Sequence, residues 1–168
     1  MMWRLIAVFA LVLATAGLRA GPAVADDPPF LAVGVGAFDV LDDETAADFR
    51  LEYRHDEKLW IVKPWAGVEA TSDGAVYGVG GILMDVFLGR RLVLTPSFGV
   101  GAYVEGGGKD LGSVIEFRSQ LETAYRFDNR SRLGVAFGHI SNASIGDDNP
   151  GTEILTVYYS LPLTGLAD

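Results

Sequence analysis

A two-residue alternation of charged and apolar side chains recurs along this chain and constrains its fold more than any other feature. Residues 47–54 read Ala-Asp-Phe-Arg-Leu-Glu-Tyr-Arg, so that every second side chain is charged. Residues 60–69 and 115–127 follow a similar pattern. Successive side chains of a β-strand point to opposite faces of a sheet, whereas a helix repeats every 3.6 residues. The alternation therefore predicts an all-β protein.

Runs of this kind, separated by turn-forming residues, predict about eight strands. We expect the strands at residues 30–39, 46–55, 59–70, 74–85, 90–104, 113–128, 131–143 and 152–163. An even number of strands, each of roughly 10 residues or more, is typical of a small antiparallel transmembrane β-barrel of the outer-membrane type.

Strand parity predicts how such a barrel would lie in the membrane, with both termini in the periplasm. The connections expected to face the cell exterior are 39–46, 70–74, 105–112 and 144–151. The short turns expected in the periplasm are 55–58, 86–89 and 128–131. Tyr53, Trp60 and Tyr125 lie beside these turns, where aromatic residues anchor a barrel at the membrane interface.

The charged face of the strands indicates what fills the barrel. Its five acidic and five basic members are Asp48, Glu52, Glu69, Glu116 and Glu122, and Arg50, Arg54, Lys63, Arg118 and Arg126. Buried charges must be paired, so this balance favours an interior of ion pairs and an apolar outer face against lipid. A soluble carrier barrel with an apolar cavity is the alternative, and that class of protein would be recovered without detergent.

The N-terminus reads as an export signal. Arg4 precedes an apolar run of about 14 residues at 5–18, and Ala23-Val24-Ala25 forms a small-x-small cleavage site. The run is shorter than the roughly 18 residues of a membrane-spanning helix. We therefore expect a signal peptide at residues 1–25, cleaved after Ala25, and a single outer-membrane barrel domain at residues 26–168.

Composition and net charge limit the classes of partner that the protein is expected to bind. The chain has no cysteine and therefore no disulfide, and 13 Lys and Arg stand against 22 Asp and Glu, a net charge of −9. Removal of Arg4 and Arg19 with the signal leaves 11 basic residues and a charge near −11. Nucleic-acid binding needs a basic face, so this charge disfavours a nucleic-acid partner. Asp147 and Asp148 read as solvated loop acids, and we expect no metal site and no cofactor.

Three polar side chains break the apolar pattern on the lipid-facing side of the last predicted hairpin. His139 and Ser141 share a parity with the large apolar residues of the seventh strand, and Glu153 shares a parity with those of the eighth. Polar groups facing lipid are costly. A base, a hydroxyl and a carboxylate are the side chains that a serine hydrolase requires. They are therefore candidate catalytic residues, and their position indicates that the substrate is a lipid.

These motifs resemble those of a known family. The segment His-Ile-Ser-Asn-Ala at 139–143, the Asn-Pro-Gly turn at 149–151 and the glutamate that follows resemble the outer-membrane lipid A 3-O-deacylases, or PagL-type enzymes. The motif similarity covers about residues 139–153, while strand number, export signal and size agree over the whole mature chain. The resemblance implies hydrolysis of the ester between a 3-hydroxyacyl chain and lipid A of lipopolysaccharide.

The resemblance also implies a role for individual residues. His139 would be the general base, Ser141 the nucleophile, and Glu153 the group that orients the imidazole. Asn142 corresponds to a side chain proposed for the oxyanion hole, and Asn149 to a supporting polar position. Ser144 stands where the family often has glycine, so its backbone N–H would be the second oxyanion donor.

A non-catalytic small barrel that stabilises the envelope or adheres to surfaces is the alternative function. For that class, replacing Ser141 by alanine leaves function intact. The residues do not decide which acyl chain is removed, whether other membrane lipids are accepted, or whether the enzyme is latent in its own membrane. Contacts between two copies of the chain would cover a lipid-facing site. The sequence leaves open whether the protein forms such a homodimer.

Overall fold

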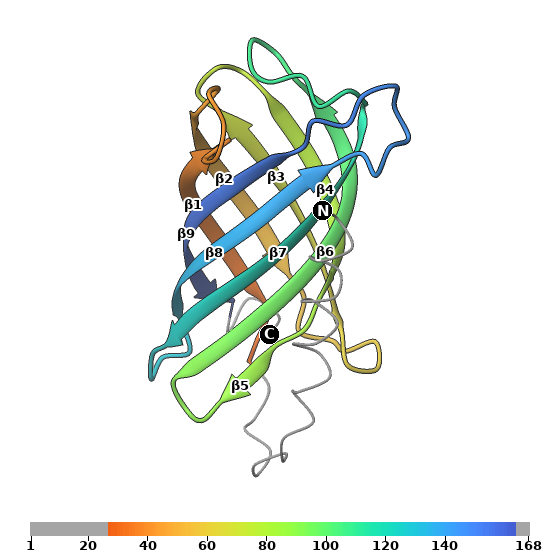
Figure 1. Cartoon of the computed structure of the whole chain (residues 1–168). Helices are drawn as coiled ribbons and strands as arrows, with labels where there is room; N and C mark the ends of the chain where they lie inside the picture. The colour runs from red at the N-terminus through yellow and green to blue at the C-terminus, as the bar shows by residue number, and fades with distance from the viewer. Residues whose placement is uncertain (1–26, 164–168) are drawn as a thin grey trace.

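The structure, a computed structural model, describes residues 27–163 as a closed antiparallel β-barrel (Figure 1). The strands are β1 (Phe30–Phe38), β2 (Ala46–Arg54), β3 (Lys63–Thr71), β4 (Val76–Leu83), β5 (Val86–Leu88), β6 (Leu92–Val104), β7 (Ile115–Arg126), β8 (Arg132–Ser141) and β9 (Thr152–Pro162). No helix within residues 27–163 is long and apolar enough to cross a membrane. The predicted signal peptide at residues 1–25 lies outside the described residues.

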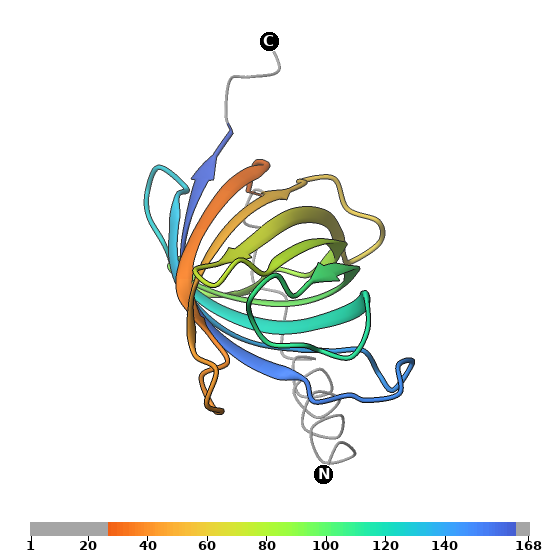
Figure 2. The same cartoon turned by 90° about the horizontal axis from the view of Figure 1, so that it is seen from above.

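The sheet closes on itself with eight positions around the ring. Neighbouring strands are paired in the order β4-β3-β2-β1-β9-β8-β7-β6-β5, and a pairing between β4 and β6 completes the ring, which Figure 2 shows from above. β4 and β5 pair with consecutive parts of β6 in one register, so they are a single strand interrupted at Met84 and Asp85. Pro96 lies opposite the interruption, and a proline has no N–H to give to the ladder. The predicted eight-stranded barrel is confirmed.

The connections gather at two opposite ends of the barrel (Figure 1). The end that we call the loop end carries the connections 39–45, 72–75, 105–114 and 142–151. The end that we call the turn end carries the connections 55–62, 89–91 and 127–131. Phe30 pairs with both Arg54 and Pro162, so the first and last strands begin and finish at the turn end. This grouping is the one that strand parity predicts.

The strand boundaries agree with the prediction to within two residues except at two places. β3 begins at Lys63 rather than at residue 59, because Leu59 pairs only with Val62 and Trp60 adopts a φ of 66°. Positive φ is rare for a residue with a Cβ and interrupts an extended strand. The predicted turn at 86–89 is also wrong, because β5 runs to Leu88 and the chain turns at Gly89, whose φ is 78°.

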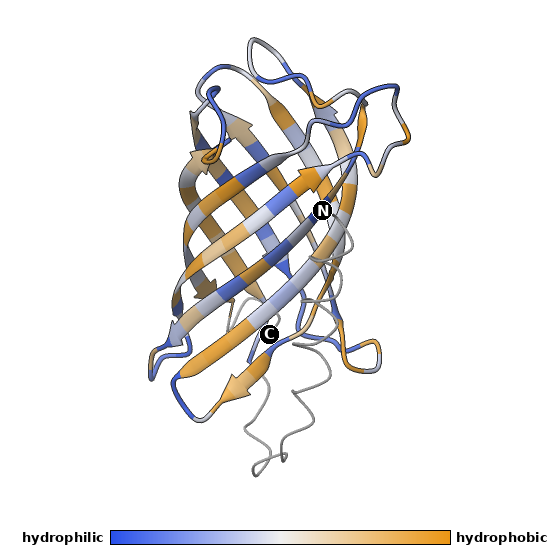
Figure 3. Ribbon diagram, in the orientation of Figure 1, coloured by the Kyte–Doolittle hydropathy of each residue, from blue (hydrophilic) through white to orange (hydrophobic). Residues whose placement is uncertain are grey.

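The two faces of the barrel wall separate as predicted, and the hydropathy colouring in Figure 3 shows the alternation along the strands. On β2, Phe49, Leu51 and Tyr53 are exposed on the outside, while the charged residues between them are buried. All ten predicted interior charges lie on the inner side; nine are buried, and the side chain of Arg126 is 14% exposed. A soluble carrier would have the opposite arrangement, so that alternative is wrong.

The interior is held together by ion pairs. Arg118 is hydrogen-bonded to Glu52 and to Glu69, and its guanidinium lies 4.4 Å from the centre of the Trp65 ring. Arg54 bridges Glu52 and Glu122 at 2.9 and 2.8 Å. Removing one partner of a buried pair costs about 3–5 kcal/mol, because the remaining charge is left without compensation. These contacts link the strands across the barrel and leave its interior filled.

The three aromatic residues predicted for an interfacial belt lie at the turn end and on the outside. Tyr53, Trp60 and Tyr125 are 43%, 88% and 46% exposed. Tyr125 also packs edge-on against Phe127, with ring centroids 5.1 Å apart. Their position is the one that aromatic side chains take at the boundary between lipid and water.

Candidate functional site

The β8–β9 hairpin places His139 and Glu153 directly opposite each other. Ser141 is two residues further along β8, at the last position of that strand and on the same face. Their chain neighbours Gly138 and Ile140 are buried, whereas the side chains of His139 and Glu153 are 41% and 26% exposed. All three candidate residues therefore lie on the outer surface of the barrel near the loop end, where the sequence predicts them.

The imidazole of His139 is bonded to the carboxylate of Glu153, with 3.1 Å between Nδ1 and Oε1. An ionised carboxylate only accepts hydrogen bonds, so this bond places the proton of a neutral imidazole on Nδ1. Nε2 is then the free base of the ring. Within residues 27–163 the Ser141 side chain makes no hydrogen bond, so its hydroxyl remains available on the same surface.

The side chain of Asn142 is buried under the loop that follows β8. Its Nδ2 donates to the carbonyls of Leu111 and Asp148 at 2.9 and 2.7 Å, and its Oδ1 accepts from the N–H of Ser144 at 2.8 Å. Both amide hydrogens are thereby used within the protein. The structure does not show the arrangement expected from the resemblance, in which Asn142 and the Ser144 N–H both face the substrate.

Asn149 lies on the other side of this loop and is half-buried. Its Oδ1 accepts the backbone N–H of Asn142 at 3.0 Å. A backbone N–H can only donate, so this bond fixes which end of the amide faces Asn142. The Nδ2 of Asn149 points the other way, and among the described residues it has no hydrogen-bond partner.

The tight path of the loop favours glycine at the position of Ser144. Ala143 and Ser144 have φ angles of 53° and 65°, which lie in the left-handed region. Glycine enters this region without a steric penalty, whereas a residue with a Cβ is strained there. Serine keeps the backbone path at that cost, and the hydrogen bond from its N–H to Asn142 Oδ1 stabilises the turn.

Gly151 packs directly against the His139 ring. It has a φ of 67°, and a Cβ at this position would lie 2.9 Å from His139 Cε1 and 3.4 Å from Nε2. The first distance is a clash, and the second is at the lower limit of ordinary van der Waals contact. The absence of a side chain at Gly151 therefore lets the imidazole lie where it does, with Nδ1 on Glu153.

An ion-paired contact, which we call the loop latch, joins three segments at the loop end and consists of Asp39, Asp42, Lys109 and Thr152. The Lys109 ammonium lies 2.6 Å from Asp39 Oδ1 and 2.9 Å from Asp42 Oδ2. The Thr152 hydroxyl donates to Asp39 Oδ1 at 3.0 Å. Thr152 stands between Gly151 and Glu153, so the latch ties the beginning of β9 to the two other long loops.

The latch shifts the pKa values of both of its charged centres. Burial raises the pKa of Asp39, but hydrogen bonds from Lys109, Thr152 and the Glu44 N–H outweigh that effect and hold this pKa below its ordinary value of 3.8. Burial lowers the pKa of Lys109, but the hydrogen bonds and charges of Asp39 and Asp42 raise it above its ordinary value of 10.5. The ionised pair is therefore the stable form at neutral pH.

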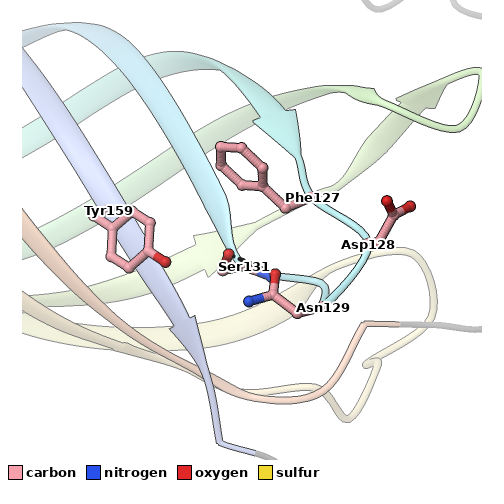
Figure 4. A pocket seen from close by; sticks show the side chains of 5 residues that line it. All are labelled: Phe127, Asp128, Asn129, Ser131 and Tyr159. Carbon is pink, nitrogen blue, oxygen red and sulfur yellow. Dashed lines mark hydrogen bonds between the residues drawn. The ribbon is translucent and has the colours of Figure 1, made fainter.

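A surface hollow at the turn end does not carry comparable chemistry. Figure 4 shows its lining residues, Phe127, Asp128, Asn129, Ser131 and Tyr159. The Ser131 hydroxyl is bonded to Asn129 at 2.7 Å, and Asp128 is paired with Arg91. No histidine lines this hollow, so the base that a serine nucleophile needs is missing there. In the part of the chain that the structure describes, no group of His, Cys, Asp or Glu side chains is arranged to hold a metal ion.

Two features of the site were not anticipated from the sequence. Gly151 appears in the predicted turn as an ordinary turn glycine, and only the packed ring of His139 reveals its second role. Lys109 follows a run of three glycines, and no local signal indicates that it would meet Asp39, which lies 70 residues earlier. Contacts between distant loops leave no short-range pattern in a sequence.

Comparison with known proteins relates this arrangement to one family. A family model described as lipid A 3-O-deacylase (PagL) matches residues 44–162. Lipid A deacylase PagL of Pseudomonas aeruginosa is 32% identical over 57 residues, which cover 34% of this chain and 33% of that protein. Lipid A deacylase PagL of Bordetella bronchiseptica is 25% identical over 99 residues, which cover 57% of this chain and 56% of that protein. The alignments thus span a third to about half of these relatives.

Two solved structures share the fold. The crystal structure of the outer membrane enzyme PagL superposes with a TM-score of 0.64 at 22% identity, covering 80% of this chain and 99% of that one. A designed transmembrane β-barrel gives a TM-score of 0.56 at 13% identity, covering 82% and 100%. The family model spans the barrel from just before β2 to the end of β9 and includes His139, Ser141 and Glu153. This outer-membrane barrel therefore belongs to the lipid A 3-O-deacylase (PagL) family.

Proposed function

We propose that this protein hydrolyses the ester that joins a 3-hydroxyacyl chain to the 3-oxygen of the proximal glucosamine of lipid A. The observation that carries the proposal is the 3.1 Å bond between His139 and Glu153 on the lipid-facing surface, with Ser141 next along the same face. A hydrogen-bonded base beside a free hydroxyl is the arrangement that activates a serine nucleophile.

His139 would act through Nε2, because Nδ1 is bonded to Glu153. In the first step the Ser141 oxygen attacks the ester carbonyl and its proton passes to Nε2. Glu153 holds the ring in this tautomer and stabilises the imidazolium that forms. The sugar oxygen then leaves with that proton, and a water molecule, deprotonated in turn by His139, releases the 3-hydroxy fatty acid from Ser141.

The charge that develops on the carbonyl oxygen requires donors, and we assign the side-chain donor to Asn149. Its Nδ2 is directed away from the bond that its Oδ1 makes to the Asn142 N–H. Asn142 has a structural role instead, because its side-chain amide donates hydrogen bonds to the backbone carbonyls of Leu111 and Asp148 and so fixes the loop. One oxyanion donor is worth on the order of 3 kcal/mol in the transition state.

The position of the site fits this substrate. His139, Ser141 and Glu153 lie near the loop end, opposite the end where β1 begins and β9 finishes. With the turn end in the periplasm, the site lies at the level of the outer leaflet, which contains lipopolysaccharide. Large apolar side chains continue along the outer face below the site, including Phe137 and Leu155 at 48% and 47% exposure, so an acyl chain has an apolar surface beside it.

The test is mass spectrometry of lipid A from cells that produce the wild type or Ser141→Ala at equal levels in the outer membrane. We expect loss of one 3-hydroxyacyl group with the wild type alone. Equal loss with both proteins would remove Ser141 from the mechanism. If neither protein changes lipid A although both are inserted, the proposed reaction is wrong and the non-catalytic barrel becomes the better interpretation.

A further inference from the structure

A fourth polar side chain, Ser119, lies beside the site on the outer face. On β7, Ser119 pairs with His139 of β8 on one side and with Phe98 of β6 on the other. The alternation of β7 turns Glu116, Arg118 and Gln120 inward and Ser119 outward, where it is half-buried. A hydroxyl from a third strand thus adjoins the catalytic histidine.

Ser119 is the small member of an otherwise bulky patch. Phe117 and Leu121 flank it on its own strand and face, and Phe98 and Phe137 stand on the neighbouring strands. The rings of Phe98 and Phe117 are stacked with centroids 6.1 Å apart and form one side of the patch. The short side chain of Ser119 therefore places a hydroxyl, rather than a large apolar group, next to His139.

The hydroxyl of Ser119 makes no hydrogen bond to any other residue in the 27–163 range. An unpaired hydroxyl against hydrocarbon is unfavourable, whereas an apolar residue of similar size would suit lipid. The cost is recovered when a polar group of a bound lipid is hydrogen-bonded to Ser119. A 3-hydroxyacyl chain carries such a group close to the ester that is cleaved.

The spacing matches. Phe117 of β7 stands directly opposite Ser141 of β8. Ser119 is two residues further along β7 and is therefore the diagonal neighbour of Ser141, with about 7–8 Å between the two backbones. From the carbonyl carbon of an acyl chain to the oxygen on its third carbon is about 4 Å, at about 1.5 Å for each bond. A hydrogen bond of about 2.8 Å between two hydroxyls completes the distance. An ester carbonyl at Ser141 therefore brings the 3-hydroxyl within reach of Ser119.

We propose that Ser119 binds the 3-hydroxyl of the acyl chain and so selects 3-hydroxyacyl esters over unsubstituted acyl esters. This inference rests on the proposed function of Ser141, His139 and Glu153. Ser119 is a substrate-recognition residue and takes no part in proton transfer. Its hydroxyl donates to the substrate oxygen or accepts from it, while the first methylene groups lie between Phe98 and Leu121.

The experiment compares two synthetic substrates with the full-length protein in mixed detergent micelles. The substrates are glucosamine derivatives whose 3-oxygen carries either a 3-hydroxytetradecanoyl or a tetradecanoyl chain, and kcat/KM is measured for each. For the wild type we expect a preference of about 10-fold or more for the hydroxylated chain. Ser119→Ala should lose that factor on the hydroxylated ester and keep its rate on the other. Ser119→Thr, which retains a hydroxyl, should restore the preference.

Thr123→Ala is the matched control. Thr123 is also an outward hydroxyl of β7, four residues further from the site, and its partner on β8 is Val135. Its removal should leave the preference unchanged. An equal loss on both esters in Ser119→Ala, no change on either, or a wild type without preference would each overturn the role of Ser119. A wild type that cleaves neither ester overturns the proposed function, and the role of Ser119 falls with it.

Discussion

The inner and outer faces of the β7–β8–β9 wall both carry charged and hydroxyl side chains, yet they differ in how many of those groups have protein partners. Inside, Arg118 is bonded to Glu52 and Glu69 and stacks on Trp65. Outside, His139 has a partner on Nδ1 only, and among the described residues Ser141 and Ser119 have none. Neighbouring residues of the same strands therefore belong to two different environments.

The difference shows what distinguishes a structural polar cluster from a candidate active site. Most interior charges are paired with an opposite charge and have little capacity left to bind anything else, although neither carboxylate oxygen of Glu116 has a hydrogen-bond partner among the described residues. The exterior groups keep free hydrogen-bonding capacity in a place where lipid, not water, is the neighbour. That capacity is unfavourable for stability alone, and a lipid substrate with polar atoms accounts for it.

Breaking the interior cluster gives the largest expected change in stability. Arg118→Met removes one of the two cationic partners of Glu52 and of Glu69, which keep Arg54 and Arg50 respectively. The free energy of unfolding should fall by about 3 kcal/mol, because two buried carboxylates are left with less compensating charge. Urea unfolding in detergent micelles measures this loss. The activity of the molecules that remain folded should stay at the wild-type level, since Arg118 does not face the site.

Ser141→Ala is the reciprocal variant for that experiment. It should lose the hydrolytic activity and keep the wild-type unfolding curve. If Arg118→Met abolished the activity of folded protein, the separation of the two faces would be wrong. The same holds if Ser141→Ala destabilised the barrel as much as Arg118→Met does.

A smaller effect is expected where a backbone position supports the exterior cluster. Gly151→Ala would place a Cβ 2.9 Å from His139 Cε1, so the ring must move away from its position on Glu153. Displacement of a catalytic group by about 1 Å can reduce the rate on the order of 10²-fold. We expect kcat of Gly151→Ala to fall by that order, as measured with the hydroxylated ester.

Gly89→Ala separates this effect from backbone strain. Gly89 has a φ of 78°, similar to that of Gly151, but nothing lies within 4 Å of a Cβ built there. Both variants should lose a similar amount of stability, about 1 kcal/mol. A normal kcat in Gly151→Ala, or an equal fall in Gly89→Ala, would argue against a role for Gly151 in positioning His139.

The smallest effect is expected from the loop latch, which is polar like the interior but lies at the loop end. Lys109→Met leaves buried Asp39 without its ammonium partner and should destabilise the protein by about 2 kcal/mol, the value of a hydrogen bond to a charged group. Arg91→Gln, which breaks the exposed pair with Asp128 at the turn end, should have a smaller effect, since exposed ion pairs contribute little.

The loop latch also predicts how the difference in stability between the wild type and Lys109→Met depends on pH. The pKa of Asp39 is lowered by folding, so its contribution is complete above 3.8 and is lost as the pH falls through the folded value. The pKa of Lys109 is raised by folding, so its contribution is complete below 10.5 and is lost at higher pH. The gap in stability between the wild type and Lys109→Met should shrink as acid protonates Asp39, whose pKa is higher in the variant because the ammonium no longer opposes the effect of burial. It should also shrink above pH 10.5 as Lys109 loses its proton. A gap that widens in acid would contradict this account.

Much of the fold was predictable because a barrel wall repeats one local rule. The alternation on β2 assigns Phe49 and Leu51 to the outside and Arg50 and Glu52 to the inside, as observed. The rule fails where backbone conformation overrides it, as at Trp60, whose positive φ delays the start of β3. It also fails at β5, where the strand continues past the predicted turn.

The candidate site was predictable to the extent that it lies on regular strands. Parity alone places His139, Ser141 and Glu153 on one face, and the resemblance to a family attaches roles to them. Asn142 has the parity of the inward-facing Gly138 and Ile140, and its side chain is buried against Leu111. Only the family resemblance assigned Asn142 to the oxyanion hole, and in our proposal that role passes to Asn149.

The sequence by itself determined which residues face lipid and which face the barrel interior, because side-chain direction in a strand depends only on the count of residues. It also determined the family, because the residues of the β8–β9 hairpin lie close together along the chain. Only the tertiary structure decided that Gly151 packs on His139, that Lys109 reaches Asp39, and that Ser119 adjoins the site. These contacts depend on strand register and loop packing between distant segments, which no local pattern of residues specifies.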